Sequence, residues 1–268
     1  MKENSENILL IDQNDIGIVR LTLNDFDNKN ALSELMIQKL IDAITESSKD
    51  NSVKVIVIAS TGNVFCSGHN LKEINEARKT DDEGESYYLE LFKTCSSLMQ
   101  LIVSCSKPVI AEVNGIATAA GCQLVASCDL AISSNSAKFA TPGVNIGLFC
   151  STPMVALSRN VSKKDSMRML LTGDMINSEE AKRISLINDF VPEEDLTKSV
   201  MHLAEKISKK SASVVSIGKE AFYKQSELNL FDAYEYTSRV MTENTLNENA
   251  KEGIDAFLEK RDPNWRDM

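Results

Sequence analysis

The sequence predicts an α/β fold that begins as strands alternating with helices and ends as a helical region. β-branched or alternating runs such as Ile16–Leu23 and Val53–Ala59 predict strands in the first half. From Lys163 onward helical patterns dominate, and no linker rich in Pro, Gly or Ser separates the two parts. A chain of 268 residues can form one large domain. We therefore expect an α/β core in residues 1–195 and, in residues 196–268, a helical region of the same domain.

Strand and helix signals follow one another through the first half. Ser33 is a favourable N-cap for the helix after the first strand, which carries an apolar stripe at helical spacing. The stripe consists of Met36, Ile37, Leu40, Ile41 and Ile44. Further strands are expected at Pro108–Val113, Leu130–Ser133 and Lys138–Ala140, and helices within Glu83–Val103 and from near Ala120 to Asp129.

The second half is predicted to be helical, with one strand. The expected helices are Asp165–Leu171, Ser178–Ile184, Leu196–Lys209, Ala212–Gln225, Leu230–Leu246 and Lys251–Lys260, and the expected strand is Leu186–Val191. Because no linker precedes these helices, we expect them to pack on the same core or to form contacts between subunits.

Composition narrows the class of protein. A hydrophobic share of 43% and a charged share of 25% are ordinary for a globular domain, and a net charge of −10 argues against nonspecific nucleic-acid binding. No apolar run approaches the ~20 residues that span a bilayer. The opening residues are too acidic and polar for a secretory or transit peptide, so we expect a cytoplasmic protein. The six cysteines form no CxxC pair and accompany no histidine cluster, so we expect no metal site.

Two segments join a predicted strand to a predicted helix through small residues. In Phe65–Lys72 (FCSGHNLK) a β-run ends in a glycine-containing turn, and a helical pattern begins at Leu71. In the second segment, Pro108–Val113 is followed by the turn Asn114–Gly115, small residues in Ala117–Gly121, and a helix. Backbone N–H groups at such junctions can bind an anion or a developing oxyanion. Each segment alone could be an ordinary turn, but the repeated arrangement favours a binding function.

These segments carry a family resemblance. Lys107–Cys150 (KPVIAEVNGIATAAGCQLVASCDLAISSNSAKFATPGVNIGLFC) and Val64–Ile74 (VFCSGHNLKEI) resemble the crotonase superfamily, which contains the enoyl-CoA hydratases, the isomerases and their relatives. The tail Glu252–Pro263 (EGIDAFLEKRDP) resembles the C-terminal helix of that family. The resemblance extends from about Ile8 to Trp265 and is strongest to the subfamily named enoyl-CoA hydratase domain-containing protein 3.

The resemblance implies a specific fold and assembly. The fold would be the crotonase spiral, with repeated ββα units, stacked sheets and a C-terminal helical region. Residues 196–268 would be the trimerisation region, so a homotrimer or a dimer of trimers is expected. The ligand would be an acyl-CoA thioester, with the coenzyme A moiety as part of the ligand and no covalently bound cofactor.

The resemblance also assigns residues to the thioester. The backbone N–H groups of His69 and Ala120 match the two donors that hold the thioester oxygen while an enolate forms. One such donor is worth roughly 3–4 kcal/mol of barrier. The family's usual glycine is Ala120 here, and an alanine can serve if its φ is negative. The positions matching the coenzyme A contacts are Lys29, Ser67, His69, Leu71 and Lys72, with Phe257 and Lys260 reaching the nucleotide of a neighbouring subunit.

The two carboxylates of the hydratases are missing. Gln123 and Gly143 occupy the positions that hold glutamates in that family. Hydration needs one group to activate water and another to protonate the α-carbon, and each typically contributes ~10²–10⁴ in rate. Between Val113 and Lys164 the one acid is Asp129, for which we expect a structural hydrogen-bonding role. Two-glutamate hydration and one-glutamate isomerisation are therefore both disfavoured.

Three functional hypotheses remain open. The chain could be an enzyme that forms a thioester enolate with an unidentified proton-transfer group, for which the His69 imidazole is one option. It could instead be a non-catalytic acyl-CoA-binding or regulatory protein. A hydrolytic use of Cys150 or Ser151 would need a base, and no paired histidine is evident. The remaining nearby acids, Glu73, Glu112 and those in Glu83–Glu90, are expected on solvated faces.

Overall fold

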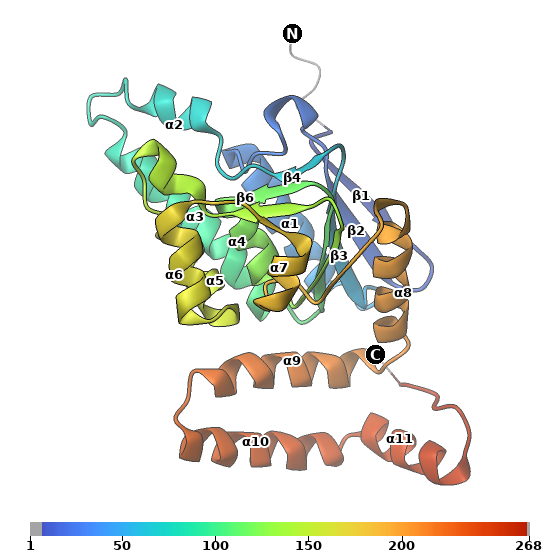
Figure 1. The fold of residues 1–268 in the computed structure, drawn as a ribbon. Helices are drawn as coiled ribbons and strands as arrows, with labels where there is room; N and C mark the ends of the chain where they lie inside the picture. Colours follow the sequence, from blue (N-terminus) through green and yellow to red (C-terminus); the bar gives the residue numbers. More distant parts are fainter. Residues whose placement is uncertain (1–6, 267–268) are drawn as a thin grey trace.

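The computed structural model describes residues 7–266 and contains two β-sheets with helices around them (Figure 1). The larger sheet has six strands in the order β1-β2-β3-β5-β7-β10. All neighbouring pairs in it are parallel except β1 with β2. Its strands are β1 (Leu9–Gln13), β2 (Ile18–Leu23), β3 (Val55–Ser60), β5 (Val109–Val113), β7 (Leu130–Ser134) and β10 (Asp189–Val191).

The smaller sheet has four strands, and the chain enters it repeatedly from the larger one. Its order is β4-β6-β8-β9, with β4, β6 and β8 parallel. The strands are β4 (Val64–Cys66), β6 (Ile116–Thr118), β8 (Lys138–Ala140) and β9 (Ile176–Asn177). Because β3, β5 and β7 lie in one sheet and the strands that follow them lie in the other, successive units wind as a spiral.

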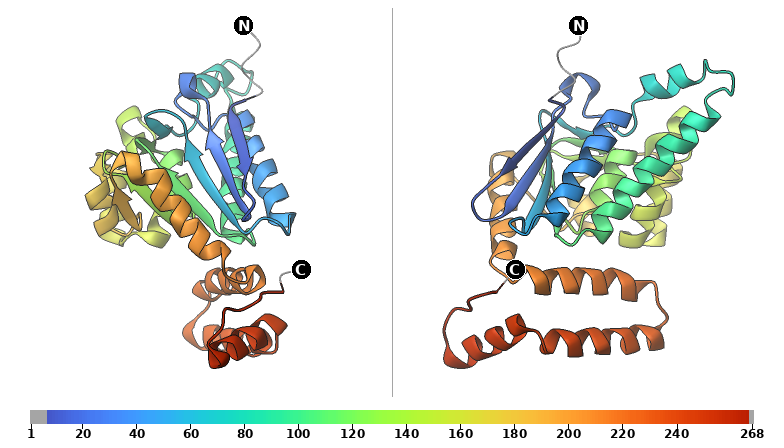
Figure 2. Two further views of the ribbon diagram at one scale, coloured as in Figure 1. Left: turned by 90° about the vertical axis from the view of Figure 1, so that its right-hand side faces the viewer. Right: turned by 180° about the vertical axis from the view of Figure 1, so that it is seen from behind.

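The larger sheet separates two apolar clusters. Alternation along β3 directs Ile56 and Ile58 into the main core and Val55 and Val57 to the opposite face. The main core is closed by α1 (Glu34–Lys49), α3 (Glu85–Ser104) and α4 (Ala120–Ser127), and the opposite face by α8 (Leu196–Ser208). Figure 2 shows α8 on one side of the sheet and α1 with α3 on the other. Ser33 caps α1 by accepting from the Met36 N–H at 3.2 Å, as predicted.

Shorter elements complete the core. They are α2 (Leu71–Ala77), α5 (Pro153–Asn160), α6 (Lys163–Thr172), α7 (Ser178–Arg183) and the 3₁₀ turns η1 (Phe26–Asn28), η2 (Pro142–Ile146) and η3 (Glu193–Asp195). The strands β1, β6 and β9 and the helix α5 are absent from the sequence-based prediction. The omission of β6 matters most, because Asn114–Gly115 turns the chain into this extra strand before α4 begins.

The C-terminal helices form an arm beside the core. It consists of α9 (Ala212–Ser226), α10 (Leu230–Thr245) and α11 (Glu248–Glu259). In Figures 1 and 2, α9 lies nearest the core, α10 runs back along it, and α11 continues from α10. Within residues 7–266, no helix is long and apolar enough to cross a membrane.

Candidate functional site

The two strand–helix junctions lie side by side. Strands β4 and β6 are parallel neighbours, with Cys66 paired to Ala117, so their carboxyl ends meet at one edge of the smaller sheet. The Thr118 hydroxyl donates to the Ser67 carbonyl at 3.2 Å and ties the junctions together. Gly68 has φ +91°, and a Cβ on it would lie 2.9 Å from the Ala119 Cβ and 3.2 Å from the Ala120 nitrogen. This approach therefore requires a residue without a side chain.

Two backbone N–H groups at these junctions are available to a ligand. In the described part of the chain, neither the His69 nor the Ala120 N–H is paired with a protein acceptor. Ala120 is the first residue of α4, where N–H groups point outward at the positive end of the helix dipole. It has a negative φ, which meets the requirement for an alanine at this position. The sequence-predicted pair of donors is thus brought together.

The strained residue at the second junction is Ala119. Its φ of 51° and ψ of −119° lie in a region that alanine rarely adopts. The conformation is held from both sides, because the Ala119 N–H donates to the Ala140 carbonyl at 2.9 Å and its carbonyl accepts from the Gln123 N–H at 3.0 Å. Such strain costs about 1–3 kcal/mol and is common at ligand sites. Here the strained residue lies directly before the Ala120 N–H, at the start of α4.

The His69 side chain is held against helix α3. Its ring lies edge to face with Phe92, with 5.4 Å between the ring centres. Nδ1 is 3.4 Å from the Leu32 carbonyl, and the buried Nε2 has no partner. Burial lowers the pKa of the imidazole, and the contact with Leu32 opposes that shift. A neutral ring that donates from Nδ1 leaves Nε2 as an unpaired acceptor.

The predicted coenzyme A contacts fall into two groups. Lys29 and Lys72 are exposed and lie together, because Lys72 Nζ donates to Asn28 Oδ1 at 3.3 Å and the Lys29 carbonyl accepts from the Ser67 N–H at 3.2 Å. Leu71, 54% exposed, follows directly on α2. These residues border the His69 junction and form one cluster with it. Two positive charges on this acidic chain suit a phosphorylated ligand.

The second group lies on the arm. Phe257 is 83% exposed on α11, and Lys260 is the residue that ends this helix, with φ 57°. In Figure 1 the arm lies on the opposite side of the core from α2. The fold of one chain therefore does not bring Phe257 and Lys260 to the Lys29 cluster, and their assignment stays a prediction about a neighbouring subunit.

Gln123 and Thr141 place buried polar atoms beside the Ala120 junction. Gln123 lies in the first turn of α4 with 4% of its surface exposed, and its Oε1 has no partner. Thr141 follows β8, is 1% exposed, and its Oγ1 is also unpaired. Sequence inspection missed Thr141, although a threonine directly after a predicted strand and before a proline was a visible signal.

The space beside Gly143 is filled. A Cβ there would lie 2.7 Å from the Leu148 carbonyl oxygen and 2.9 Å from Cys150 Sγ. The Leu148 N–H also donates to the Gly143 carbonyl at 2.9 Å, which fixes this loop. A glutamate at position 143 could not be added without moving the main chain. The glutamate is therefore missing together with the space for it.

Cys150 and Ser151, the two candidate nucleophiles, are poorly suited to attack a thioester. Burial raises the pKa of the Cys150 thiol, and a backbone hydrogen bond from Gly143 only partly opposes this. A thiol must ionise to attack, so a raised pKa makes Cys150 a poor nucleophile. The Ser151 hydroxyl is exposed and turns to the Phe149 carbonyl at 3.4 Å. Within residues 7–266, neither side chain forms a hydrogen bond with a histidine.

The acids near the site are engaged elsewhere. Glu112, predicted on a solvated face, is buried and binds Arg20 at 2.6 Å and the Thr197 hydroxyl at 2.7 Å, so that prediction was wrong. The error arose because Glu112 faces α8, a helix distant in sequence. Asp129 has the expected structural role, since it accepts from the Val109 N–H at 2.7 Å and binds Lys219 at 2.6 Å.

Glu73 and the acids on α3 complete the picture. Glu73 lies half-buried on α2, and its carboxylate accepts from the Glu34 N–H at the start of α1 at 3.3 Å and from Asn70 Nδ2 at 3.1 Å. Burial raises the pKa of this carboxyl. Glu83, Glu85 and Glu90 are exposed, as predicted. Among the described residues, no three His, Cys, Asp or Glu side chains gather as metal ligands.

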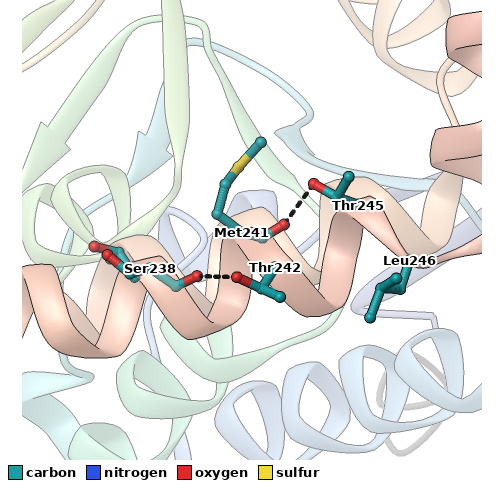
Figure 3. A pocket seen from close by; sticks show the side chains of 6 residues that line it. Ser238, Met241, Thr242, Thr245 and Leu246 are labelled. Atoms are coloured by element: carbon teal, nitrogen blue, oxygen red, sulfur yellow. Dashed lines mark hydrogen bonds between the residues drawn. The ribbon is translucent and has the colours of Figure 1, made fainter.

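A separate open hollow lies on the arm. It is lined by Thr237, Ser238, Met241, Thr242, Thr245 and Leu246, all at one face of α10 or directly after it (Figure 3). The Thr242 hydroxyl donates to the Ser238 carbonyl at 2.8 Å and the Thr245 hydroxyl to the Met241 carbonyl at 2.7 Å. Because these hydroxyls turn back to their own helix, the hollow presents mainly apolar groups and lacks charged side chains suited to chemistry.

Comparisons with known proteins identify the family and the fold. The family described as enoyl-CoA hydratase/isomerase matches residues 13–268. The fold is shared with a crystal structure of enoyl-CoA hydratase from Mycobacterium smegmatis, 44% identical with a TM-score of 0.92 over 97% of this chain and 99% of that one. The chain belongs to the enoyl-CoA hydratase/isomerase family, and the predicted crotonase fold is confirmed.

The resemblance to one subfamily is also confirmed. The chain is 49% identical to the enoyl-CoA hydratase domain-containing protein 3, mitochondrial, of Xenopus laevis over 96% of this chain and 86% of that protein. The crystal structure of human enoyl-CoA hydratase domain-containing protein 3 is 46% identical and covers 96% of this chain and 100% of that chain. Its TM-score is 0.92.

The predicted cytoplasmic location is contradicted. The relatives of this name from Xenopus laevis, Mus musculus and Homo sapiens are all described as mitochondrial. The prediction rested on the acidic composition of the opening residues, of which 1–6 lie outside the described part. The composition of these opening residues does not indicate the compartment in which the folded protein is found.

Proposed function

We propose that this chain binds an acyl-CoA thioester and stabilises its enolate oxygen with the backbone N–H groups of His69 and Ala120. The observation that supports the proposal is that these two N–H groups, which have no protein acceptor among the described residues, follow neighbouring parallel strands. Charge that develops on the thioester oxygen would be met by two oriented dipoles and by the amino end of α4. The exposed Lys29 and Lys72 beside the first junction supply charge for the phosphates of coenzyme A.

The same site disfavours efficient hydration of an enoyl-CoA. Gln123 cannot exchange a proton near neutral pH, and the space at Gly143 is closed by Leu148 and Cys150. Asp129 is occupied by Lys219 and lies at the far end of α4. Enolate formation by this chain would need another base, and His69, whose Nε2 is unpaired, is one candidate.

The alternative is a non-catalytic acyl-CoA-binding or regulatory protein. It is favoured by the loss of both carboxylates and of the space at Gly143, because these changes remove chemistry while the two N–H donors remain. Both hypotheses require binding of a thioester. They differ in whether the protein exchanges the acidic proton on the α-carbon of the bound thioester.

The test measures binding and proton transfer separately. Purified protein is titrated with butyryl-CoA by calorimetry, incubated with butyryl-CoA in D₂O for deuterium incorporation at the α-carbon, and assayed with crotonyl-CoA for loss of enoyl absorbance. Binding with α-exchange supports the enzyme, and binding without exchange supports the alternative. Absence of binding would refute both, and rapid crotonyl-CoA hydration would refute our interpretation of Gln123 and Gly143.

Two variants test the residues. Gly68→Ala puts a Cβ 2.9 Å from the Ala119 Cβ and should abolish thioester binding, whereas Gly147→Ala, also at positive φ but with nothing within 4 Å, should bind normally. His69→Asn keeps the backbone donor and removes the imidazole. Loss of α-exchange with retained binding would identify His69 as the base, and unchanged exchange would exclude it.

We also propose that the arm assembles three copies of the chain, or two such trimers. The buried residues of its helices are Ala221, Ala233, Asn249 and Ala256. Its large exposed apolar side chains are Phe222, Leu228, Leu230, Phe231, Tyr234, Met241, Leu246, Ile254, Phe257 and Leu258. Apolar surface on this scale marks an interface. Sedimentation should give a mass of three or six chains, and Phe231→Glu should lower it; a monomeric wild-type protein would refute the proposal.

A further inference from the structure

The Lys29 ammonium is held by an aromatic ring and not by a carboxylate. Its Nζ lies 4.8 Å from the centre of the Phe26 ring, a distance at which a cation is attracted to the face of the ring. No ion pair within residues 7–266 includes Lys29. Lys182, which also lies over a ring, is by contrast paired with Asp189 at 2.7 Å. The ring therefore orients the Lys29 ammonium without cancelling its charge.

Lys72 is also held by a neutral group. Its Nζ donates to Asn28 Oδ1 at 3.3 Å, and no ion pair includes it in the part of the chain that the structure describes. An acid at the helical spacing for an ion pair is present, because Glu76 lies four residues further along α2. That carboxylate instead binds Lys79 Nζ at 2.6 Å. The charge of Lys72 therefore stays available, as that of Lys29 does.

The acids of the turn η1 do not pair with the two lysines. Asp25 accepts from Asn28 Nδ2 with both carboxylate oxygens, at 3.0 and 3.1 Å. Asp27 is exposed and forms no ion pair among the described residues. On a chain with a net charge of −10, two cations without a carboxylate partner beside one turn form a local positive site.

The turn that carries Phe26 and Lys29 is anchored to the connection between β3 and β4. Lys29 and Asn30 both have positive φ, 58° and 51°, which reverses the chain direction tightly. Asn30 is 1% exposed, and its Nδ2 donates to the Thr61 carbonyl at 3.0 Å. The Phe26 ring rests on Gly62, where a Cβ would lie 2.7 Å from a ring carbon. Backbone and ring are thus both fixed before a ligand binds.

A phosphate is the ligand group that this arrangement suits. The ring contact of Lys29 uses none of the three N–H donors of its ammonium, and the contact of Lys72 with Asn28 uses one of three. Phosphate oxygens can accept from the remaining donors of both lysines in charge-assisted hydrogen bonds. A carboxylate in the place of Phe26 or Asn28 would hold the lysine equally well but would repel the phosphate.

We propose that Phe26 and Asn28 are positioning residues that hold the ammonium groups of Lys29 and Lys72 in place for a phosphate of coenzyme A. The inference rests on the proposed binding of an acyl-CoA thioester and deepens it. Each residue acts through one lysine, whose long side chain would otherwise be ordered only when the ligand binds. Ordering one such side chain lowers affinity by about two- to tenfold.

The test measures the dissociation constant of butyryl-CoA by calorimetry in a double-variant cycle. Phe26→Leu should weaken binding about threefold, whereas Phe26→Tyr, which keeps a ring under the ammonium, should bind like the wild type. Lys29→Met should weaken binding at least about tenfold, because it removes a charged donor. In the Lys29→Met background, Phe26→Leu should have no further effect. Lys182→Met removes an equal charge from a lysine that Asp189 already neutralises, and should leave the affinity unchanged.

Asn28→Ala is the corresponding variant for Lys72. It should weaken butyryl-CoA binding about threefold in the wild-type background and not at all in the Lys72→Met background. Phe26 is 54% exposed and Asn28 is half-buried, so all of these variants should fold. Their melting temperatures, measured by circular dichroism, check this.

The outcomes separate this inference from the function on which it rests. If butyryl-CoA does not bind the wild-type protein, the proposed function fails. If it binds, and binds Phe26→Leu and Asn28→Ala as tightly as the wild type, the inference alone is overturned. An equal loss of affinity with and without the lysine would show that the replaced residue only supports the turn, and would also overturn the inference. Wild-type affinity in Lys29→Met and Lys72→Met would place the phosphates elsewhere, with the same consequence.

Discussion

The ion pair between Lys219 and Asp129 should dominate the attachment of the arm to the core. Lys219 Nζ donates to Asp129 at 2.6 Å and to the carbonyls of Ile102 and Lys107, each at 2.9 Å. Asp129 also accepts from the Tyr223 hydroxyl at 2.9 Å. The Lys219 side chain is 7% exposed and that of Asp129 is 16% exposed, so water screens this pair only weakly.

Lys219→Met should strongly destabilise the protein. Methionine fills a similar volume but leaves a buried carboxylate without its cation and two carbonyls without their donor. Removing one partner of a buried pair typically costs 3–5 kcal/mol. For a domain of this size ~1 kcal/mol corresponds to roughly 2–4 °C in Tm, so the melting temperature should fall by roughly 6–20 °C.

The assay is thermal unfolding followed by circular dichroism, with denaturant titration of the same variants. Lys79→Met is the control, because its pair with Glu76 is 66% and 71% exposed and should change stability by less than ~0.5 kcal/mol. The double variant Lys219→Met/Asp129→Asn should be more stable than Lys219→Met alone, since the unpaired charge is gone. A loss below ~1 kcal/mol for Lys219→Met, or a double variant less stable than the single one, would refute this account.

Three further predictions concern the site and the surface. Gly143→Glu should lower the Tm, since overpacking costs about 1–3 kcal/mol. Even combined with Gln123→Glu, it should not restore crotonyl-CoA hydration in an absorbance assay. Strong hydration would contradict the conclusion that the space beside Cys150 is filled. Ala119→Gly should raise the free energy of unfolding by ~0.5–1 kcal/mol in denaturant titration, because glycine adopts a φ of 51° without strain. The control Ala117→Gly, in strand β6, should lower it. The opposite order would contradict the backbone strain at Ala119. Hydrogen bonds from Arg183 and Arg168 lower the pKa of Glu180 to about 2. Because this pKa is depressed in the folded state, its stabilising contribution is present above about pH 4.5 and is lost as the pH falls to about 2. Glu180→Gln should flatten the pH dependence of unfolding in that window, and an unchanged slope would show that the contacts do not matter.

The local signals in the sequence were sufficient for most elements. Four of the five residues of the predicted stripe on α1 are buried, since helical spacing places Met36, Ile37, Leu40 and Ile44 on one face, and Ile41 at its edge is half-buried. β4 and α4 also form where expected. Local pattern failed where pairing decides the structure: β6 is three residues long and exists because β4 and β8 lie on either side of it. β1 is exposed at most of its positions, and it too is a strand because it pairs with a neighbour, β2.

The candidate site shows the same division. His69 and Ala120 could be predicted because their donors belong to the backbone and depend on small residues at two turns. The burial of Glu112 could not be predicted, because Arg20 and Thr197 are distant in sequence. Nor could the burial of the Gln123 and Thr141 side-chain oxygens without partners, because it depends on how distant segments pack.

The sequence by itself determined the family, the fold class and the absence of glutamate at positions 123 and 143, and it predicted the two backbone donors. These follow from residue identity and local pattern, which the printed chain contains in full. Only the tertiary structure decided that the space beside Gly143 is closed, that Asp129 is committed to Lys219, and that Gln123 and Thr141 are enclosed without partners. Such facts depend on which atoms remain within contact distance after distant segments pack, and packing between distant segments leaves no local signal.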